Sequence, residues 1–209
     1  MLIAITRPVS PSLAKCELTH LAREPIDVAR ATSQHAAYEH LLGSLGATIV
    51  RAPAAPQFPD AVFIEDTAIV LDEVAVLTRP GAPSRQGESA AVAPVLAKYR
   101  SLLSMEPPAT LDGGDVLRLG RTLYVGRSGR TNQEGIEELQ RLVERFDYRV
   151  VPVEFTGCQA LAVGRGFKQA AVESGYVIYA CSVMPEHVHL VIAKHPRDIR
   201  RIMAHLRAF

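Results

Sequence analysis

The chain has 209 residues, of which 48% are hydrophobic and 22% are charged, and its formal net charge is +1. This length allows one domain or two small ones, and the composition is ordinary for a globular protein. A charge close to zero provides no overall field that would attract nucleic acid or a membrane surface. No segment approaches the roughly 18 consecutive apolar residues of a membrane span.

The cysteines and the N-terminus bear on the cellular compartment. Cys16, Cys158 and Cys181 lack the spacing of a metal-binding finger, and their number is odd. The apolar run at the start of the chain is too short for a signal peptide and predicts a first strand instead. We therefore expect reduced thiols and a cytoplasmic protein.

Strand-like runs alternate with helical patterns over the first three quarters of the chain. Apolar spacing predicts helices over Asp27–Leu45 and Ala90–Tyr99, and a third helix opens at the capping-box pattern Thr131–Glu134. The predicted strands are Ile3–Thr6, Ala47–Arg51, Val62–Phe63, Ala68–Leu71, Val74–Thr78, Asp115–Leu119, Thr122–Val125 and Arg149–Val153. The order strand, strand, helix, strand recurs about every fifty residues, which indicates a repeated module.

The pattern changes after Phe155. We expect a helix over Ala160–Glu173, a hairpin of Tyr176–Met184 with His187–Ala193, and a basic amphipathic helix over Arg197–Arg207. This small α+β helix–hairpin–helix fragment is short for a domain of its own. The predicted domains are thus 1–155 and 156–209.

Two loops beside predicted strands are rich in acidic residues. These residues are Asp60, Glu65, Asp66, Asp112 and Asp115. A guanidinium is planar, cationic and rich in donors, so proteins bind it with carboxylates placed for paired hydrogen bonds. Acids beside proline and glycine are also common as simple turn residues, which is the alternative interpretation. The complete set, with an aromatic residue inside it, favours a guanidinium site.

These motifs resemble the dimethylarginine dimethylaminohydrolase family, within the arginine deiminase and amidinotransferase superfamily. The resemblance runs from about residue 1 to residue 157. The motifs that carry it are Asp27–Arg30, Gln34–His35, Phe58–Asp66, Thr78–Ala82, Ser84–Glu88, Leu111–Asp115 and Arg130–Asn132. The resemblance implies an α/β fold, namely an incomplete ββαβ propeller with three of the family's five modules.

The resemblance also implies a substrate site in the central channel for a small guanidino ligand such as methylated arginine, without a cofactor. The carboxylates that would hold the guanidinium or the substrate amine are Asp60, Glu65 and Asp66. The residues that would surround the ligand are Phe63 on the guanidinium plane, Arg85 and Arg130 on the α-carboxylate, and Leu18 on a lid.

Catalysis in this family requires a thiolate that attacks the guanidinium carbon and a histidine that transfers protons. Asp112 would orient and polarise that histidine. However, no histidine follows the strand that ends near Phe155, and no cysteine matches the nucleophile position. Cys16 and Cys158 are better interpreted as buried or incidental thiols. We therefore expect impaired catalysis.

A second resemblance concerns the C-terminal part. His187 and His189 would face the same side of a strand and could chelate a divalent metal such as Mg²⁺ or Mn²⁺. Two surface histidines on a hairpin are the alternative. The segment Tyr179–Ile192 resembles the IS200-like single-tyrosine transposases, although no tyrosine follows it. The basic residues that could contact DNA, or simply form a solvated helix face, are Arg197, Arg200, Arg201 and Arg207.

Three hypotheses therefore stand. The chain is a dimethylargininase-like hydrolase fragment that acts on, or only binds, guanidino compounds. Alternatively, it is a DNA-binding, transposase-like remnant. The third hypothesis is a non-functional gene-fusion product, in which an open propeller edge would favour self-association.

Overall fold

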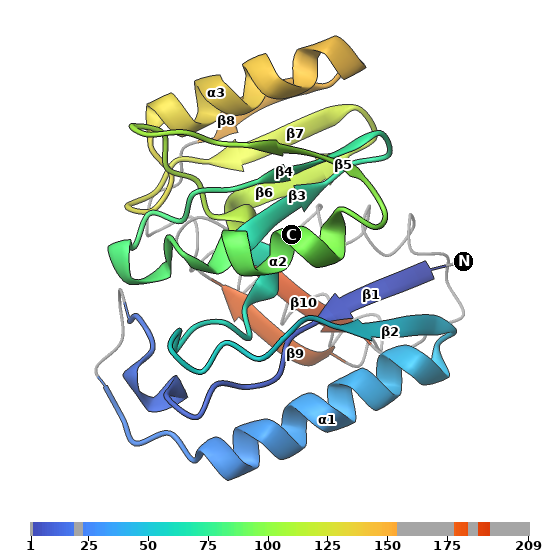
Figure 1. Ribbon diagram of the computed structural model, residues 1–209, viewed down its shortest axis with the longest axis vertical. Helices are drawn as coiled ribbons and strands as arrows, with labels where there is room; N and C mark the ends of the chain where they lie inside the picture. Colours follow the sequence, from blue (N-terminus) through green and yellow to red (C-terminus); the bar gives the residue numbers. More distant parts are fainter. Residues whose placement is uncertain (1, 19–22, 154–177, 184–187, 193–209) are drawn as a thin grey trace.

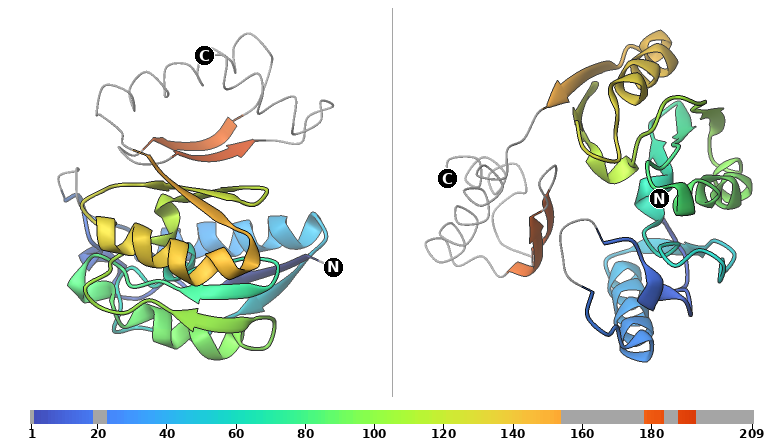
Figure 2. Two further views of the ribbon diagram at one scale, coloured as in Figure 1. Left: turned by 90° about the horizontal axis from the view of Figure 1, so that it is seen from above. Right: turned by 90° about the vertical axis from the view of Figure 1, so that its left-hand side faces the viewer.

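The computed structural model describes residues 2–18, 23–153, 178–183 and 188–192. It shows an α/β chain in which small sheets and their helices follow one another along an arc (Figures 1 and 2). Among the described residues, no helix is long and apolar enough to cross a membrane.

The second module has the order of strand, strand, helix and strand, although its last strand is not among the predicted ones. Its elements are β3 (Ala68–Val70), β4 (Val74–Leu77), α2 (Glu88–Leu96) and β5 (Ser101–Ser104). The central strand β4 pairs antiparallel with β3 and parallel with β5. The helix is therefore the crossover that parallel strands require.

The third module repeats this arrangement. Its elements are β6 (Val116–Leu119), β7 (Thr122–Gly126), α3 (Gln133–Val143) and β8 (Arg149–Val153). The central strand β7 pairs antiparallel with β6 and parallel with β8. The two modules therefore share one topology.

The first module is simpler than the sequence pattern predicts. It consists of β1 (Leu2–Thr6), α1 (Val28–Ser44) and β2 (Ala47–Arg51), with β1 parallel to β2. The prediction of three complete ββαβ modules is wrong here, because β1 already takes the place of β4 and β7. No described strand pairs with β1 on its other side.

Two local predictions also differ from the structure. Val62–Phe63 is not a strand, because the Phe63 N–H donates to the Asp60 carbonyl (2.9 Å) in a turn that leads into the 3₁₀ helix η2 (Ile64–Thr67). The N-cap of α3 is Asn132 rather than Thr131, since the Asn132 side chain accepts the N–H of Gly135.

A single apolar core joins the second and third modules. It contains one face of each sheet and the buried side of α3, including Val76, Leu123 and Leu139. A smaller cluster of Leu77, Val92 and Leu96 lies between the second module and β1. These cores fix the loops at the strand ends relative to one another.

In the C-terminal part, the structure describes β9 (Ile178–Val183) and β10 (Val188–Ile192), which pair antiparallel. These strands match the predicted hairpin, and His189 falls within β10. The predicted helices over 160–173 and 197–207, His187 and the four arginines proposed for DNA binding lie outside the described residues.

Candidate functional site

Two short 3₁₀ helices carry acidic residues to the same place. The helix η2 precedes β3 and contains Glu65 and Asp66, and η4 (Gly113–Asp115) precedes β6 and follows Asp112. The N–H of Gly114 donates to Oδ1 of Asp66 (3.0 Å), which ties the two helices together. Loops that are 48 residues apart in the chain are thus adjacent in the structure.

Two glycines permit this close approach. A Cβ on Gly113 would collide with the backbone oxygen of Glu65, so only glycine allows η4 to lie against η2. A Cβ on Gly81 would likewise collide with the backbone of Arg130. Close packing between loops therefore requires glycine at position 81 in Thr78–Ala82 and at position 113 in Leu111–Asp115.

Asp112 is a buried carboxylate with few compensating contacts. It is 3% exposed, accepts the N–H of Gly81 (3.0 Å) and receives Nη1 of Arg130 at 3.4 Å. Burial and the nearby charge of Asp66 raise its pKa to about 6, although Gly81 and the arginines oppose this. The ionised form of Asp112 is therefore less favourable in the folded chain than in water.

Arg85 lies at the centre of the acidic cluster and is 1% exposed. Its Nη1 donates to Asp66 (2.7 Å) and its Nη2 donates to Glu88 (2.8 Å), while Asp112 lies 3.9 Å from Nη1. Burial opposes the charge of this guanidinium, but hydrogen bonds to Glu88 and the charge of Asp66 outweigh it and raise the pKa of Arg85. The cluster thus already holds one guanidinium, which belongs to the protein.

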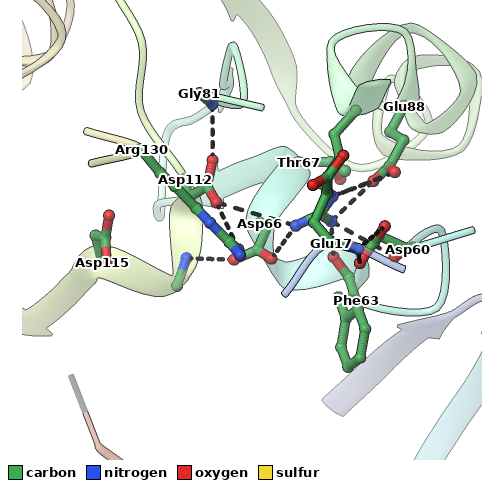
Figure 3. Close-up of polar contacts among 12 residues, drawn as sticks. Glu17, Asp60, Phe63, Asp66, Thr67, Gly81, Glu88, Asp112, Asp115 and Arg130 are labelled. Atoms are coloured by element: carbon green, nitrogen blue, oxygen red, sulfur yellow. Dashed lines mark hydrogen bonds and ion pairs between the residues drawn. The ribbon is translucent and has the colours of Figure 1, made fainter. Parts of the chain in front are cut away.

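Asp60 extends the cluster toward the early loop. Both of its carboxylate oxygens accept the backbone N–H of Glu17, at 3.2 and 3.1 Å. The Glu17 carboxylate in turn accepts the hydroxyl of Ser84 (2.5 Å). Burial is the main reason why the pKa of Asp60 lies above its usual value. Figure 3 shows Asp60, Asp66 and Asp112 in one region of the molecule.

The other predicted ligand residues lie at the border of this cluster. Phe63 is 43% exposed and Glu65 is exposed, whereas Leu18 is half-buried in the early loop. The side chain of Arg130 is 28% exposed and lies beside Asp112 (Figure 3). The structure therefore brings Asp60, Asp66, Asp112, Arg85 and Arg130 together and leaves Phe63 and Glu65 more open to solvent.

Arg7 is a residue of this region that the sequence interpretation missed. It is fully buried, and none of its three guanidinium nitrogens has a hydrogen-bond partner within the described part of the chain. Burial lowers its pKa, and the charge of Glu88 partly compensates. The available signal was a repeat, because Thr6-Arg7-Pro8 at the end of β1 recurs as Thr78-Arg79-Pro80 after β4.

The described residues contain no group of three or more histidine, cysteine, aspartate or glutamate side chains that could hold a metal ion. The predicted pair of His187 and His189 is not tested by this, because His187 lies outside the described residues.

No protein-family model matches the chain. The chain is 43% identical over 151 residues to the dimethylarginine dimethylaminohydrolase of Streptomyces coelicolor, covering 72% of this chain and 58% of that protein. It is 30% identical over 192 residues to the putative hydrolase DDAH2 of Bos taurus, covering 88% of this chain and 67% of that protein. Over about 70% of its length, the chain belongs to the dimethylarginine dimethylaminohydrolase family.

Solved structures of this family agree with the fold. The dimethylarginine dimethylaminohydrolase of Pseudomonas aeruginosa complexed with citrulline shares 30% identity with this chain, at a TM-score of 0.71. The match covers 75% of this chain and 63% of that one. The α/β modules thus correspond to part of the propeller of this family. The comparisons give no evidence for the transposase resemblance.

The matched region is only part of a family member. The chain spans 58% of the Streptomyces coelicolor protein and 50% of its Pseudomonas aeruginosa counterpart, to which it is 34% identical over 129 residues. The activity and substrates of the complete relatives therefore do not transfer directly to this chain.

Proposed function

We propose that this chain binds a guanidino ligand, such as methylated arginine, in the acidic cluster and acts as a dimethylargininase-like fragment with impaired catalysis. The observation that carries the proposal is the convergence of Asp60, Asp66 and Asp112 around a buried guanidinium. Asp66 accepts from this guanidinium at 2.7 Å, Asp112 lies 3.9 Å from it, and carboxylates gathered in this way are what a free guanidinium would need. A family structure complexed with citrulline supports the same class of ligand.

The electrostatics of Asp112 also support a cationic ligand. Its raised pKa means that burial in this site disfavours the ionised carboxylate. A guanidinium beside Asp112 would stabilise that charge and displace the proton. Ligand affinity is therefore expected to rise as the pH increases through about 6.

The remaining side chains suggest how the ligand is positioned. The exposed Glu65 and the ring of Phe63 are accessible to a ligand that enters from solvent. Arg130 is proposed to meet the ligand's carboxylate. Arg85 could do so only by giving up its 2.7 Å contact with Asp66, so we propose that it mainly holds the acidic cluster in place.

We propose binding without turnover. Asp112 would orient a histidine, whereas the partners that its carboxylate has in the described part of the chain include Gly81 and Arg130. Cys16 is a free cysteine that is buried after the 3₁₀ helix η1 (Leu13–Lys15). A nucleophile must face the ligand carbon with a base in reach, and we assign that role to no thiol here.

Calorimetric titration of the purified chain with asymmetric dimethylarginine tests the binding. Glu65→Gln and Asp112→Asn should each weaken binding by roughly tenfold or more, because each removes a charge-assisted hydrogen bond. The matched control is Asp72→Asn, an acid that pairs with Arg118 at a hairpin corner outside the cluster. Equal affinity for citrulline, which carries no positive guanidinium, would contradict the proposal.

An assay for citrulline release tests the catalytic part. The wild-type chain should release none from methylated arginine. Release that Asp112→Ala abolishes would show a complete catalytic apparatus and overturn the proposal of impaired turnover.

A further inference from the structure

Asp115 is one of the acids that the sequence groups into a guanidinium site, but its contacts give it a different task. It is the last residue of η4 and is 6% exposed. Its Oδ2 accepts the hydroxyl of Ser128 (2.9 Å) and the hydroxyl of Thr131 (2.5 Å). Figure 3 shows Asp115 apart from Asp60. This carboxylate oxygen is therefore bound to the turn that carries Arg130.

The hydroxyl of Ser128 organises the backbone of this turn. Its oxygen accepts the N–H of Arg130 (3.0 Å) and the N–H of Thr131 (3.1 Å). The N–H of Ser128 donates to the carbonyl of Thr131 (3.1 Å), which closes the turn. A hydroxyl has one proton to donate and two acceptor sites. All of them are used, because the proton goes to Asp115, so the orientation of the Ser128 side chain is fixed.

Thr131 connects the same turn to Asp112, the buried carboxylate of the acidic cluster. The oxygen of the Thr131 hydroxyl accepts the backbone N–H of Asp112 (3.2 Å), and its proton goes to Asp115. Thr131 is fully buried, so water does not compete for these hydrogen bonds. Because Asp112 and Asp115 lie at the two ends of η4, the turn is fastened to both ends of that helix.

Gly81 makes a further contact with the turn. A Cβ at this position would collide with the backbone of Arg130, so the two segments touch directly. From this fixed backbone, Nη1 of Arg130 reaches Oδ2 of Asp112 at 3.4 Å. Arginine has a long side chain with many rotamers, and a fixed backbone reduces the conformational freedom that ligand binding must remove. The hydrogen bonds of the turn therefore bear on how well Arg130 can meet a ligand.

We propose that Asp115 is a positioning residue, which holds, through Ser128 and Thr131, the turn that presents Arg130 to the carboxylate of an amino-acid ligand. This inference rests on the proposed binding of a guanidino ligand and on the proposed contact between Arg130 and the ligand's carboxylate. The other acids of the cluster face the guanidinium end of the ligand. Asp115 acts on the carboxylate end, without touching the ligand, and so favours amino acids over simple guanidines.

Two ligands separate this role from a general loss of structure. Asymmetric dimethylarginine has a carboxylate, and dimethylagmatine is the same molecule without it. Calorimetric titration of the wild-type chain should show tighter binding of dimethylarginine. Ser128→Ala should lower the ratio of the two affinities by roughly tenfold, because the backbone of Arg130 and its neighbour lose their hydrogen bonds to the hydroxyl. Asp115→Ala should lower the ratio in the same direction.

The second hydroxyl of the network allows a rescue test. Thr131→Val removes this hydroxyl at nearly constant shape and should lower the affinity ratio, whereas Thr131→Ser keeps the hydroxyl and should keep the ratio. The matched control is Ser44→Ala, which removes an exposed hydroxyl that donates to the Leu41 carbonyl on α1. This control should have the wild-type ratio.

A double variant tests whether the network acts through Arg130. Arg130→Ala should lower the affinity ratio by itself. Adding Ser128→Ala to it should lower the ratio no further, because both substitutions remove the same contact with the ligand. Independent effects of the two substitutions would refute the positioning role.

The same titrations distinguish a failure of this inference from a failure of the proposed function. If the wild-type chain binds neither ligand, the proposed function is wrong and the positioning role falls with it. If the wild-type chain binds both ligands and Ser128→Ala weakens both equally, guanidino binding stands and the positioning role is refuted. The hydrogen bonds of the turn would then stabilise the fold without selecting the ligand.

Discussion

The substitution Asp112→Asn is the most informative perturbation of the acidic cluster. The pKa of Asp112 rises from 3.8 to about 6 in the folded chain, mainly because the side chain is buried. At neutral pH, where the group is ionised, a rise of this size costs about 3 kcal/mol of folding free energy. The amide has no charge to desolvate and should remove this cost.

The direction of the pH dependence of stability follows from proton binding at Asp112. Between about pH 4 and pH 6 the folded state binds more protons at Asp112 than the unfolded state, so the stability of the wild type falls as the pH rises. The asparagine variant lacks this titration. Its stability relative to the wild type should therefore increase by about 2–3 kcal/mol from pH 4 to pH 7.

Urea unfolding followed by circular dichroism at pH 4, 5, 6 and 7 measures this difference by linear extrapolation. Burial also raises the pKa of Asp60 and of Glu88. Both groups are present in the wild type and in the variant, so their contributions to the stability difference largely cancel. A packing defect in the variant would change the free energy of unfolding by the same amount at every pH. A difference in stability that stays constant from pH 4 to pH 7 would refute the argument.

Three further substitutions test the framework, each by urea unfolding at pH 7. Gly113→Ala should destabilise the chain by about 1–3 kcal/mol, because the added Cβ would collide with the backbone oxygen of Glu65. The control Gly43→Ala, whose Cβ lies in open space on α1, should stabilise the chain by about 0.5–1 kcal/mol. Equal effects of the two substitutions would contradict the close approach of η4 to η2. Asp66→Asn should cost about 3 kcal/mol by removing the charge that pairs with the buried Arg85 at 2.7 Å, and a change below about 1 kcal/mol would show that Glu88 alone suffices. Asn132→Ala should cost about 1 kcal/mol by removing the N-cap of α3. An unchanged stability would show that the Asn132 side chain does not cap this helix.

Local patterns in the sequence were sufficient for much of the framework. The helical spacing of apolar residues predicted α1 and α3 to within a few residues, and the recurring order of elements predicted repeated modules. The acidic residues next to Gly113 and in Ile64–Thr67 also stood out as candidates for one site. These features depend on neighbours close in the chain, which is why they are visible without a structure.

Other features depend on contacts between distant residues. The strand β5 is a short Ser-Leu-Leu-Ser run that no periodicity reveals, and it exists because β4 pairs with it. The resemblance assigned Arg85 to a ligand, whereas the folded chain surrounds it with Asp66 and Glu88. The recurrence of Thr6-Arg7-Pro8 as Thr78-Arg79-Pro80 marks Arg7 in the sequence but does not show that its guanidinium is buried.

The sequence by itself therefore determined most of the helices and strands and both acidic loops, because periodicity and turn chemistry act over a few residues. The tertiary structure alone decided which carboxylates meet which guanidinium and which of the described side chains are buried. These outcomes depend on packing between modules, where burial changes both the charge state of Asp112 and the partners available to Arg85.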